Sequence, residues 1–206
     1  MTGKWGKTCE TVCEEWIIKQ RFNRERDIYS KYLEKGLQAE EAGITLLTLT
    51  QKLGMITKNE EKFENQFMTG TPDLLINETV YDIKSSWDIF TFPMFSDSIP
   101  NKNYEWQLQV YMHLTGLKKA RLAYVLVDTP EALRYQEARK ISYQRGMEGD
   151  IDDELEDIIN SSMTFSDIPK ANRVKIYDIE YDPNKIKKLE ARVTECRDYI
   201  SSICKE

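Results

Sequence analysis

The segment at residues 70–86 constrains the fold more than any other part of the chain, because it combines short apolar runs with closely spaced charges. Its sequence, GTPDLLINETVYDIKSS, contains β-type runs at 73–76 and 79–84 with turn-forming residues between them. A further β-type run lies at 63–69. The pattern predicts three strands in close succession that form an antiparallel meander.

Three charged side chains in this segment are expected to meet. Side chains alternate along a strand, so Asp82 and Lys84 point to the same side, and a neighbouring strand can bring Asp73 beside them. Unpaired charge is unfavourable on a strand as apolar as TVYDIK, and a divalent ion would resolve the problem. The two carboxylates and the Ile83 carbonyl suit Mg²⁺ or Mn²⁺, while Lys84 can hold or help deprotonate an attacking water. This is the chemistry that phosphodiester hydrolysis needs.

The rest of the chain predicts a mixed α/β arrangement. Helical periodicity marks a short helix and a longer region that Gly36 and Gly43 can divide in two, and later segments alternate helix with strand. The expected helices are 10–18, 24–53, 104–114, 131–161 and 183–203; the expected strands are 120–128 and 173–181; residues 87–103 are expected to form an ordered loop.

The charged segment resembles a known nuclease motif. TPDLL followed by VYDIKSS is similar to the PD-(D/E)XK pattern, here Pro72-Asp73 and then Asp82-Ile83-Lys84. The resemblance implies a restriction-endonuclease-like core, in which a central mixed sheet is flanked by helices. It also implies that Asp73, Asp82 and Lys84 are catalytic.

Two flanking motifs resemble the lambda exonuclease and RecB-like branches of that superfamily. Upstream, KGLQAEEAG is similar to their helical glutamate motif and makes Glu40 the candidate for holding a second ion, with Glu41 as its rival. Downstream, Gln107 and Tyr111 match a QxxxY helix motif, and their spacing puts both on one helix face, where they can position water, phosphate or DNA.

The resemblance implies a Mg²⁺- or Mn²⁺-dependent nuclease with DNA as its substrate. The lambda-type branch implies an exonuclease acting on DNA ends in phage-type recombination or repair, with a single-strand annealing protein and a homo-oligomer as further expectations. One alternative is a RecB-like nuclease with an iron–sulfur cluster, as in CRISPR adaptation. Another is an inactive nuclease-like module that binds DNA or protein.

The cysteines and the histidine bear on these alternatives. Cys9 and Cys13 lie near one end of the chain, and Cys196 and Cys204 near the other, which differs from the one-plus-three arrangement of the iron–sulfur nucleases. Helical spacing indicates ordinary thiols on terminal helices, and a four-thiolate site joining the termini is a second reading. The single histidine, His113, excludes multi-histidine zinc sites.

A net charge of −6 and a pI near 5.1 would ordinarily argue against nucleic acid, but the charge is uneven. Seven acidic residues lie in 148–157, and 19–26 and 118–121 are basic. A locally basic groove is therefore compatible with the composition.

The candidates for DNA contact are Ser85, Ser86, Trp87, Lys102, Arg134 and Arg139. For Trp87 and the aromatics that follow it, base stacking and a small hydrophobic cluster under the loop are both open; for the basic residues, the other reading is a solvated helix face.

We expect one domain over 1–206, with its core at about 24–128 and 172–203 and a charged helical insertion at about 130–170. No apolar run approaches the ~20 residues that a membrane helix needs. The first residues lack the apolar stretch of a secretory signal, so we expect the cytoplasm of a bacterial or phage-infected cell.

Overall fold

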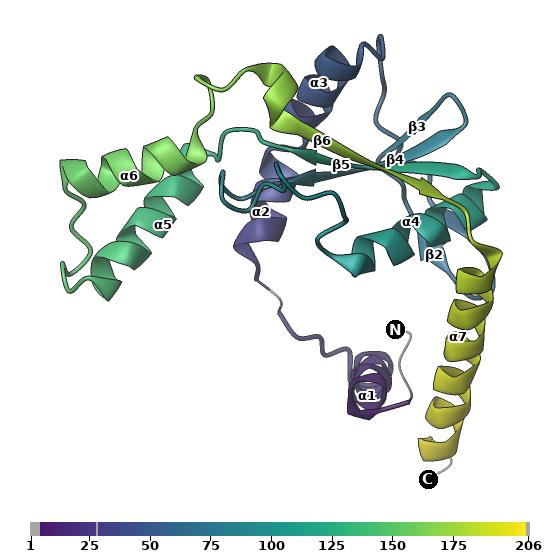
Figure 1. The fold of residues 1–206 in the computed structure, drawn as a ribbon. Coiled ribbons are helices and arrows are strands. Elements are labelled where there is room, and N and C mark those ends of the chain that lie inside the picture. The colour runs from purple at the N-terminus through teal and green to yellow at the C-terminus, as the bar shows by residue number, and fades with distance from the viewer. Residues whose placement is uncertain (1–4, 28, 205–206) are drawn as a thin grey trace.

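The computed structural model describes residues 5–27 and 29–204, and its centre is a four-stranded mixed sheet (Figure 1). The strand order is β3-β4-β5-β6, in which β4 and β5 are parallel and both outer pairs are antiparallel. The strands are β3 (Leu74–Ile76), β4 (Thr79–Ser85), β5 (Lys119–Val125) and β6 (Val174–Glu180). The expected mixed α/β class with a central mixed sheet is confirmed.

Helices flank this sheet and extend beyond it (Figure 1). They are α1 (Lys7–Phe22), α2 (Lys31–Gln38), α3 (Glu40–Gln51), α4 (Lys102–Thr115), α5 (Glu131–Gln144), α6 (Asp153–Met163), the short 3-10 helix η1 (Lys170–Arg173) and α7 (Pro183–Ile203). α1 packs against α7, which brings the two ends of the described chain together.

The two faces of the sheet are covered by different helices, because β4 and β5 are apolar on both sides. On one face Val80 packs in a cluster with Leu108 and Met112 of α4. On the other face Tyr81 packs in a cluster with Leu47 of α3. The alternation along β4 therefore puts its even-numbered residues on the α4 side.

The helical region expected over 24–53 is shorter than predicted. Asn23 ends α1 in a left-handed conformation, and residues 24–27 fold back on α1 through the ion pairs Lys19–Glu25 and Arg26–Glu15. The next helix begins only at residue 31. The division between α2 and α3 falls at Ala39, not at a glycine.

The predicted three-stranded meander is wrong in its first strand. The segment expected at 63–69 holds only β1 (Phe63–Glu64), which pairs with β2 (Thr69–Gly70) in a separate two-stranded sheet. The side chain of Asn65 accepts hydrogen bonds from the N–H groups of Phe67 and Met68, so the chain turns immediately after β1. The pairing of β3 with β4 is as expected.

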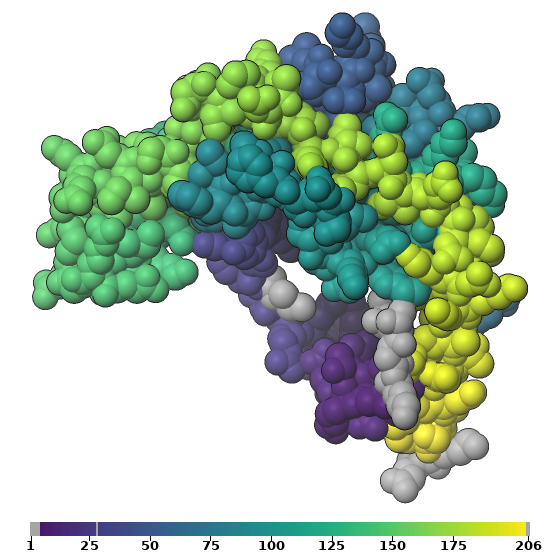
Figure 2. All heavy atoms as spheres, in the orientation of Figure 1, coloured from purple at the N-terminus to yellow at the C-terminus, as the bar shows by residue number. Residues whose placement is uncertain are grey.

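The helical region expected over 131–161 is a hairpin of α5 and α6 that projects from the body of the molecule (Figures 1 and 2). The connection contains Gly146 and Gly149, both with positive φ. Leu133, Leu155 and Ile159 are among the residues of a separate hydrophobic cluster inside the hairpin. None of the described helices is long and apolar enough to cross a membrane.

Candidate active site

Asp82 and Lys84 form an ion pair on β4. Their Oδ2 and Nζ atoms lie 2.7 Å apart, and both side chains belong to the sheet face that α4 covers. The Asp82 side chain is only 1% exposed, whereas Lys84 retains 23% of its side-chain surface. A buried carboxylate thus lies beneath a partly accessible ammonium.

Asp73 immediately precedes β3 and is held beside this pair by the hairpin. Leu74 pairs with Tyr81, so the register continues to place Asp73 opposite Asp82. Asp73 Oδ2 accepts a hydrogen bond of 2.6 Å from the backbone N–H of Ile83. The structure therefore brings together the three charged groups that the motif joins, with the Ile83 peptide between them.

The pKa values of the two carboxyl groups reflect their burial. The pKa of Asp82 is raised to about 6, mainly by burial and also by the charge of Asp73, against the opposing effect of Lys84. The pKa of Asp73 is also raised, first by burial, although the Ile83 N–H and the Lys84 charge oppose the shift. Burial lowers the pKa of Lys84, but the two aspartates outweigh this effect and leave it above its usual value.

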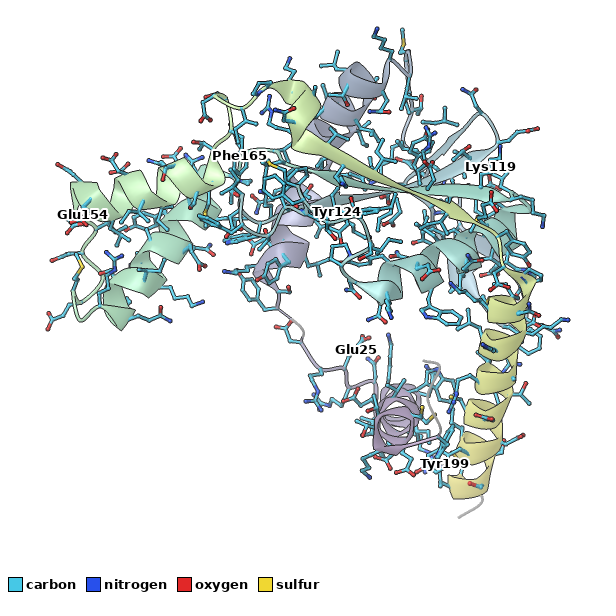
Figure 3. The ribbon with its side chains drawn as sticks, viewed as in Figure 1. Glu25, Lys119, Tyr124, Glu154, Phe165 and Tyr199 are labelled. Atoms are coloured by element: carbon cyan, nitrogen blue, oxygen red, sulfur yellow. The ribbon has the colours of Figure 1, made fainter. Side chains whose placement is uncertain are left out.

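These groups line an open cavity of about 590 Å³ bounded by α2, α4, β4 and β5. The expected site residues in its wall are Glu40, Asp73, Asp82, Ile83, Lys84, Ser85, Ser86, Trp87 and Gln107. Tyr111 lies one helical turn beyond Gln107, whose Nε2 donates a hydrogen bond of 2.8 Å to the Tyr111 hydroxyl. Tyr124, labelled in Figure 3, completes the β5 side of the cavity.

Glu40 reaches the cavity, and its rival Glu41 is not among the lining residues. Glu40 Oε2 forms an ion pair of 2.7 Å with Lys58 Nζ, and its charge raises the pKa of Asp73. Within residues 5–27 and 29–204, no three acidic, histidine or cysteine side chains are close enough to hold a metal ion together. The role of Glu40 toward a second ion stays a prediction.

The donor set nevertheless fits one hard divalent ion. Asp82 Oδ2 is buried and, despite its closeness to Lys84, has no hydrogen-bond partner of suitable geometry. A buried carboxylate oxygen without a donor is unfavourable, and a cation next to it would compensate for the lost hydration. The Asp73 carboxylate lies on the neighbouring chain segment beside Asp82. Carboxylate oxygens are ligands that suit Mg²⁺ or Mn²⁺.

The residues expected to contact DNA are dispersed. Trp87 is only 3% exposed and packs in the hydrophobic cluster of the α5–α6 hairpin, which leaves little of its ring open for base stacking. Lys102 lines a different cavity, and Arg134 donates to the Thr129 carbonyl and lines the space between α5 and α6. Arg139 lies exposed on α5. Ser85 and Ser86 line the same cavity as Asp82 and Lys84.

The cavity is also lined by Tyr104, one of the aromatics considered for base stacking, and by Tyr124 and Lys58, which were not predicted. Tyr104 of α4 places its ring 4.7 Å from Lys84 Nζ, and Tyr124 stands beside Lys84 in the β4–β5 register. Strand alternation could have identified Tyr124, because β5 residues that neighbour Lys84 must share its face. Lys58 lies in a segment without regular secondary structure, and no pattern in the sequence identifies it as a cavity residue.

The cysteines lie away from this site, on α1 and α7. Cys13 is buried, and its Sγ is 4.0 Å from the carbonyl oxygen of Cys196. Burial raises the pKa of Cys13 to about 11, with further contributions from Cys196 and Cys9. These contacts are those of thiols between packed helices.

Comparisons with known proteins give structural relatives only. No protein-family model matches the chain, and no curated protein matches its sequence. The crystal structure of a phage-related exonuclease from Haemophilus somnus 129PT is similar with a TM-score of 0.77 and 28% identity, over 98% of this chain and 84% of that one.

Two crystal structures of an alkaline exonuclease, LHK-Exo from Laribacter hongkongensis, share the fold. One has a TM-score of 0.63 and 14% identity over 98% of this chain and 84% of that one. The other, a complex with dAMP, has a TM-score of 0.63 and 15% identity over 97% and 83%. The chain thus shares its fold with phage-related and alkaline exonucleases, lambda-exonuclease-like proteins that are part of the PD-(D/E)XK nuclease superfamily.

Proposed function

We propose that the protein is a metal-dependent nuclease that hydrolyses DNA phosphodiester bonds, and that it works from DNA ends. The observation that carries this proposal is the buried Asp82 carboxylate, with Asp73 and Lys84 beside it, at an open cavity of about 590 Å³. A binding module has no need of two adjacent carboxylates where phosphates must approach, because they repel the ligand. A hydrolytic site needs them to hold a cation.

The groups that would hold Mg²⁺ or Mn²⁺ are the carboxylates of Asp73 and Asp82 and the carbonyl of Ile83, with Glu40 available for a second ion. Such an ion, when bound, activates a water molecule and stabilises negative charge on phosphate.

The surrounding side chains act on the water and the phosphate. The Lys84 ammonium can donate hydrogen bonds to both, and the Tyr104 ring beside it limits its motion. The Gln107 side-chain oxygen is left to accept from water, because its Nε2 donates to Tyr111. Tyr111 thus orients the Gln107 amide.

Action on DNA ends is supported by the structural relative at 28% identity, which is described as a phage-related exonuclease. The proposal includes a role in phage-type recombination or repair, in the cytoplasm of a bacterial or phage-infected cell, and the description of that relative as phage-related supports the phage-type role. A single-strand annealing protein as partner and a homo-oligomeric assembly belong to this proposal.

The test is incubation of end-labelled linear DNA and covalently closed circular DNA with Mg²⁺ or Mn²⁺. Linear DNA should be degraded and closed circles left intact, and Asp82→Asn and Lys84→Met should abolish cleavage. Matched controls are Asp157→Asn and Lys119→Met, which change exposed residues away from the cavity. Cutting of circles would indicate an endonuclease. No cleavage by folded wild-type protein in either metal would favour the DNA- or protein-binding module.

A further inference from the structure

The cavity lined by Asp73, Asp82 and Lys84, here called the catalytic cavity, continues into a second cavity between α2 and α5. The second cavity has a volume of about 510 Å³ and shares Ser30, Tyr32 and Trp87 with the catalytic cavity. A third hollow on the surface of α5 shares Gln136 and Lys140 with the second. A continuous path, here called the α2–α5 groove, therefore leads from Ser30 and Tyr32 at the catalytic cavity to Lys140 on α5.

Side chains of residues 29–31 contact α5 across this groove. Lys31 Nζ forms an ion pair of 2.9 Å with Glu137 and lies 4.5 Å from the centre of the Trp87 ring. The Tyr29 hydroxyl donates to Gln136 at 3.3 Å. Side chains of residues 29–31 thus contact α5 directly, and this short separation of the walls favours one extended strand over a duplex.

Aromatic rings stand exposed along the groove. Tyr32 is 56% exposed at the junction of the two cavities, and its edge packs on Trp87 with ring centres 6.0 Å apart. At the outer end Tyr143 is 56% exposed, and Arg139 donates a 3.0 Å hydrogen bond to its hydroxyl. Rings that are supported on one side and open on the other can stack on unpaired bases.

The charge of the groove is opposite to that of the protein as a whole. Lys31, Arg139 and Lys140 are positive and only Glu137 is negative, although the net charge of the chain is −6. α6, the other helix of the hairpin, has four acidic residues and no basic one (Figure 1). Glu154 lies toward its outer end (Figure 3). The cationic surface of the hairpin is thus on α5, the helix that borders the groove.

We propose that the α2–α5 groove binds one unpaired strand of DNA that extends from the catalytic cavity. The choice of DNA rests on the proposed function, while the single-strand preference rests on the short separation of the walls, the exposed rings and the three cations. Stacking makes the groove tolerant of sequence, and the cations bind phosphates.

Binding is measured by fluorescence anisotropy in EDTA, where no cleavage occurs, with a labelled single strand of about 16 nucleotides and a blunt duplex of equal length. Arg139→Glu/Lys140→Glu should weaken single-strand binding by tenfold or more and reduce the salt slope by about 0.7 per lost phosphate contact. Blunt-duplex binding should change much less. Lys119→Glu/Lys187→Glu is the control with the same charge change; Lys119 lies at the opposite end of the sheet (Figure 3).

Stacking is tested at Tyr32, which carries no charge. Tyr32→Ala should lower single-strand affinity on the order of tenfold, and Tyr32→Phe should retain it. Equal losses for the two double variants, or wild-type binding by both Tyr32→Ala and Arg139→Glu/Lys140→Glu, would overturn the groove proposal.

The groove proposal and the proposed nuclease function can be refuted independently of each other. Wild-type cleavage of linear DNA together with unchanged binding by the groove variants would refute the groove alone. Variant-sensitive binding of single strands without cleavage in Mg²⁺ or Mn²⁺ would refute the nuclease and leave the groove in place. Wild-type protein that binds no single strand would refute the groove.

Discussion

Gly70 faces the ring of Tyr111 so closely that a methyl group on Gly70 would lie 2.5 Å from Tyr111 Cε1. The ring is 9% exposed and has little room to retreat. β2, a strand outside the central sheet, therefore determines where the Tyr111 hydroxyl meets Gln107. This contact leads to the first prediction.

Gly70→Ala should lower the free energy of unfolding by about 1–3 kcal/mol, because the added methyl group overpacks the Tyr111 ring. Cleavage should fall as well, since the ring carries the hydroxyl that orients Gln107. Denaturant unfolding and initial cleavage rates measure the two effects. Gly36→Ala is the stability control: its methyl group meets nothing within 4 Å, and alanine should stabilise α2 by up to about 1 kcal/mol. Wild-type stability of Gly70→Ala would contradict the close contact.

Gln107→Leu should reduce kcat with little change in KM, because it removes the amide that faces the reacting water while the cavity walls remain. Tyr111→Phe removes only the hydroxyl that holds the Gln107 amide, and a smaller reduction of about tenfold is expected. Steady-state cleavage of end-labelled DNA separates the two parameters. A rise in KM with unchanged kcat in both variants would show that Gln107 binds substrate and does not act on the water.

Divalent ions should raise the Tm of the wild-type protein in a concentration-dependent manner, because a ligand that binds only the folded state stabilises it. Asp82→Asn should abolish this increase, because it removes one of the two carboxylates that would hold the ion. Differential scanning fluorimetry with Mg²⁺ or Mn²⁺ gives the readout. The exposed Asp157→Asn is the control, and an undiminished response in Asp82→Asn would place the ion elsewhere.

Lys35 makes stability depend on pH above neutrality. It is fully buried, its Nζ donates to the carbonyls of Ser86 and Trp87 at 2.5 and 3.1 Å, and burial lowers its pKa from 10.5 to about 8. Between these values the unfolded chain binds more protons at this site, so its contribution to stability increases as pH rises from about 8 to 10.5. Below pH 8 the buried charge costs up to about 3 kcal/mol.

The comparison of wild-type protein with Lys35→Met isolates this effect. The difference in unfolding free energy between the two should change across pH 8 to 10.5 in favour of the wild type, as measured by urea unfolding at several pH values. Lys31→Met is unsuitable as a control because Lys31 is half-buried and forms an ion pair with Glu137, so the exposed Lys187→Met serves instead. A pH-independent difference would show that Lys35 is charged to the same extent in both states.

Much of the geometry of the candidate site could be predicted because it is local. Asp73, Asp82 and Lys84 are brought together by one hairpin, and the alternation of strand side chains fixes which of them share a face. The Gln107–Tyr111 pair is equally local, since one helical turn separates the two residues.

Other parts depend on contacts between distant segments and could not be read from the sequence. The sequence left two readings open for Trp87, because the hairpin cluster and Lys31 that cover its ring lie in other parts of the chain. The contact of Lys58 with Glu40 and the burial of Lys35 have the same origin. The first strand of the expected meander ends early because the Asn65 side chain accepts a hydrogen bond from the Phe67 N–H and the chain turns there.

The parallel pairing of β4 with β5 has a consequence for the order of folding. β3 and β4 are joined by a two-residue turn and can pair at once, but a parallel neighbour requires a long crossover, here through α4. Asp73 and Asp82 are thus neighbours in an early hairpin, whereas Tyr124 and Gln107 arrive only when the crossover closes. We therefore expect Asp73 and Asp82 to come together during folding before the cavity beside them has formed.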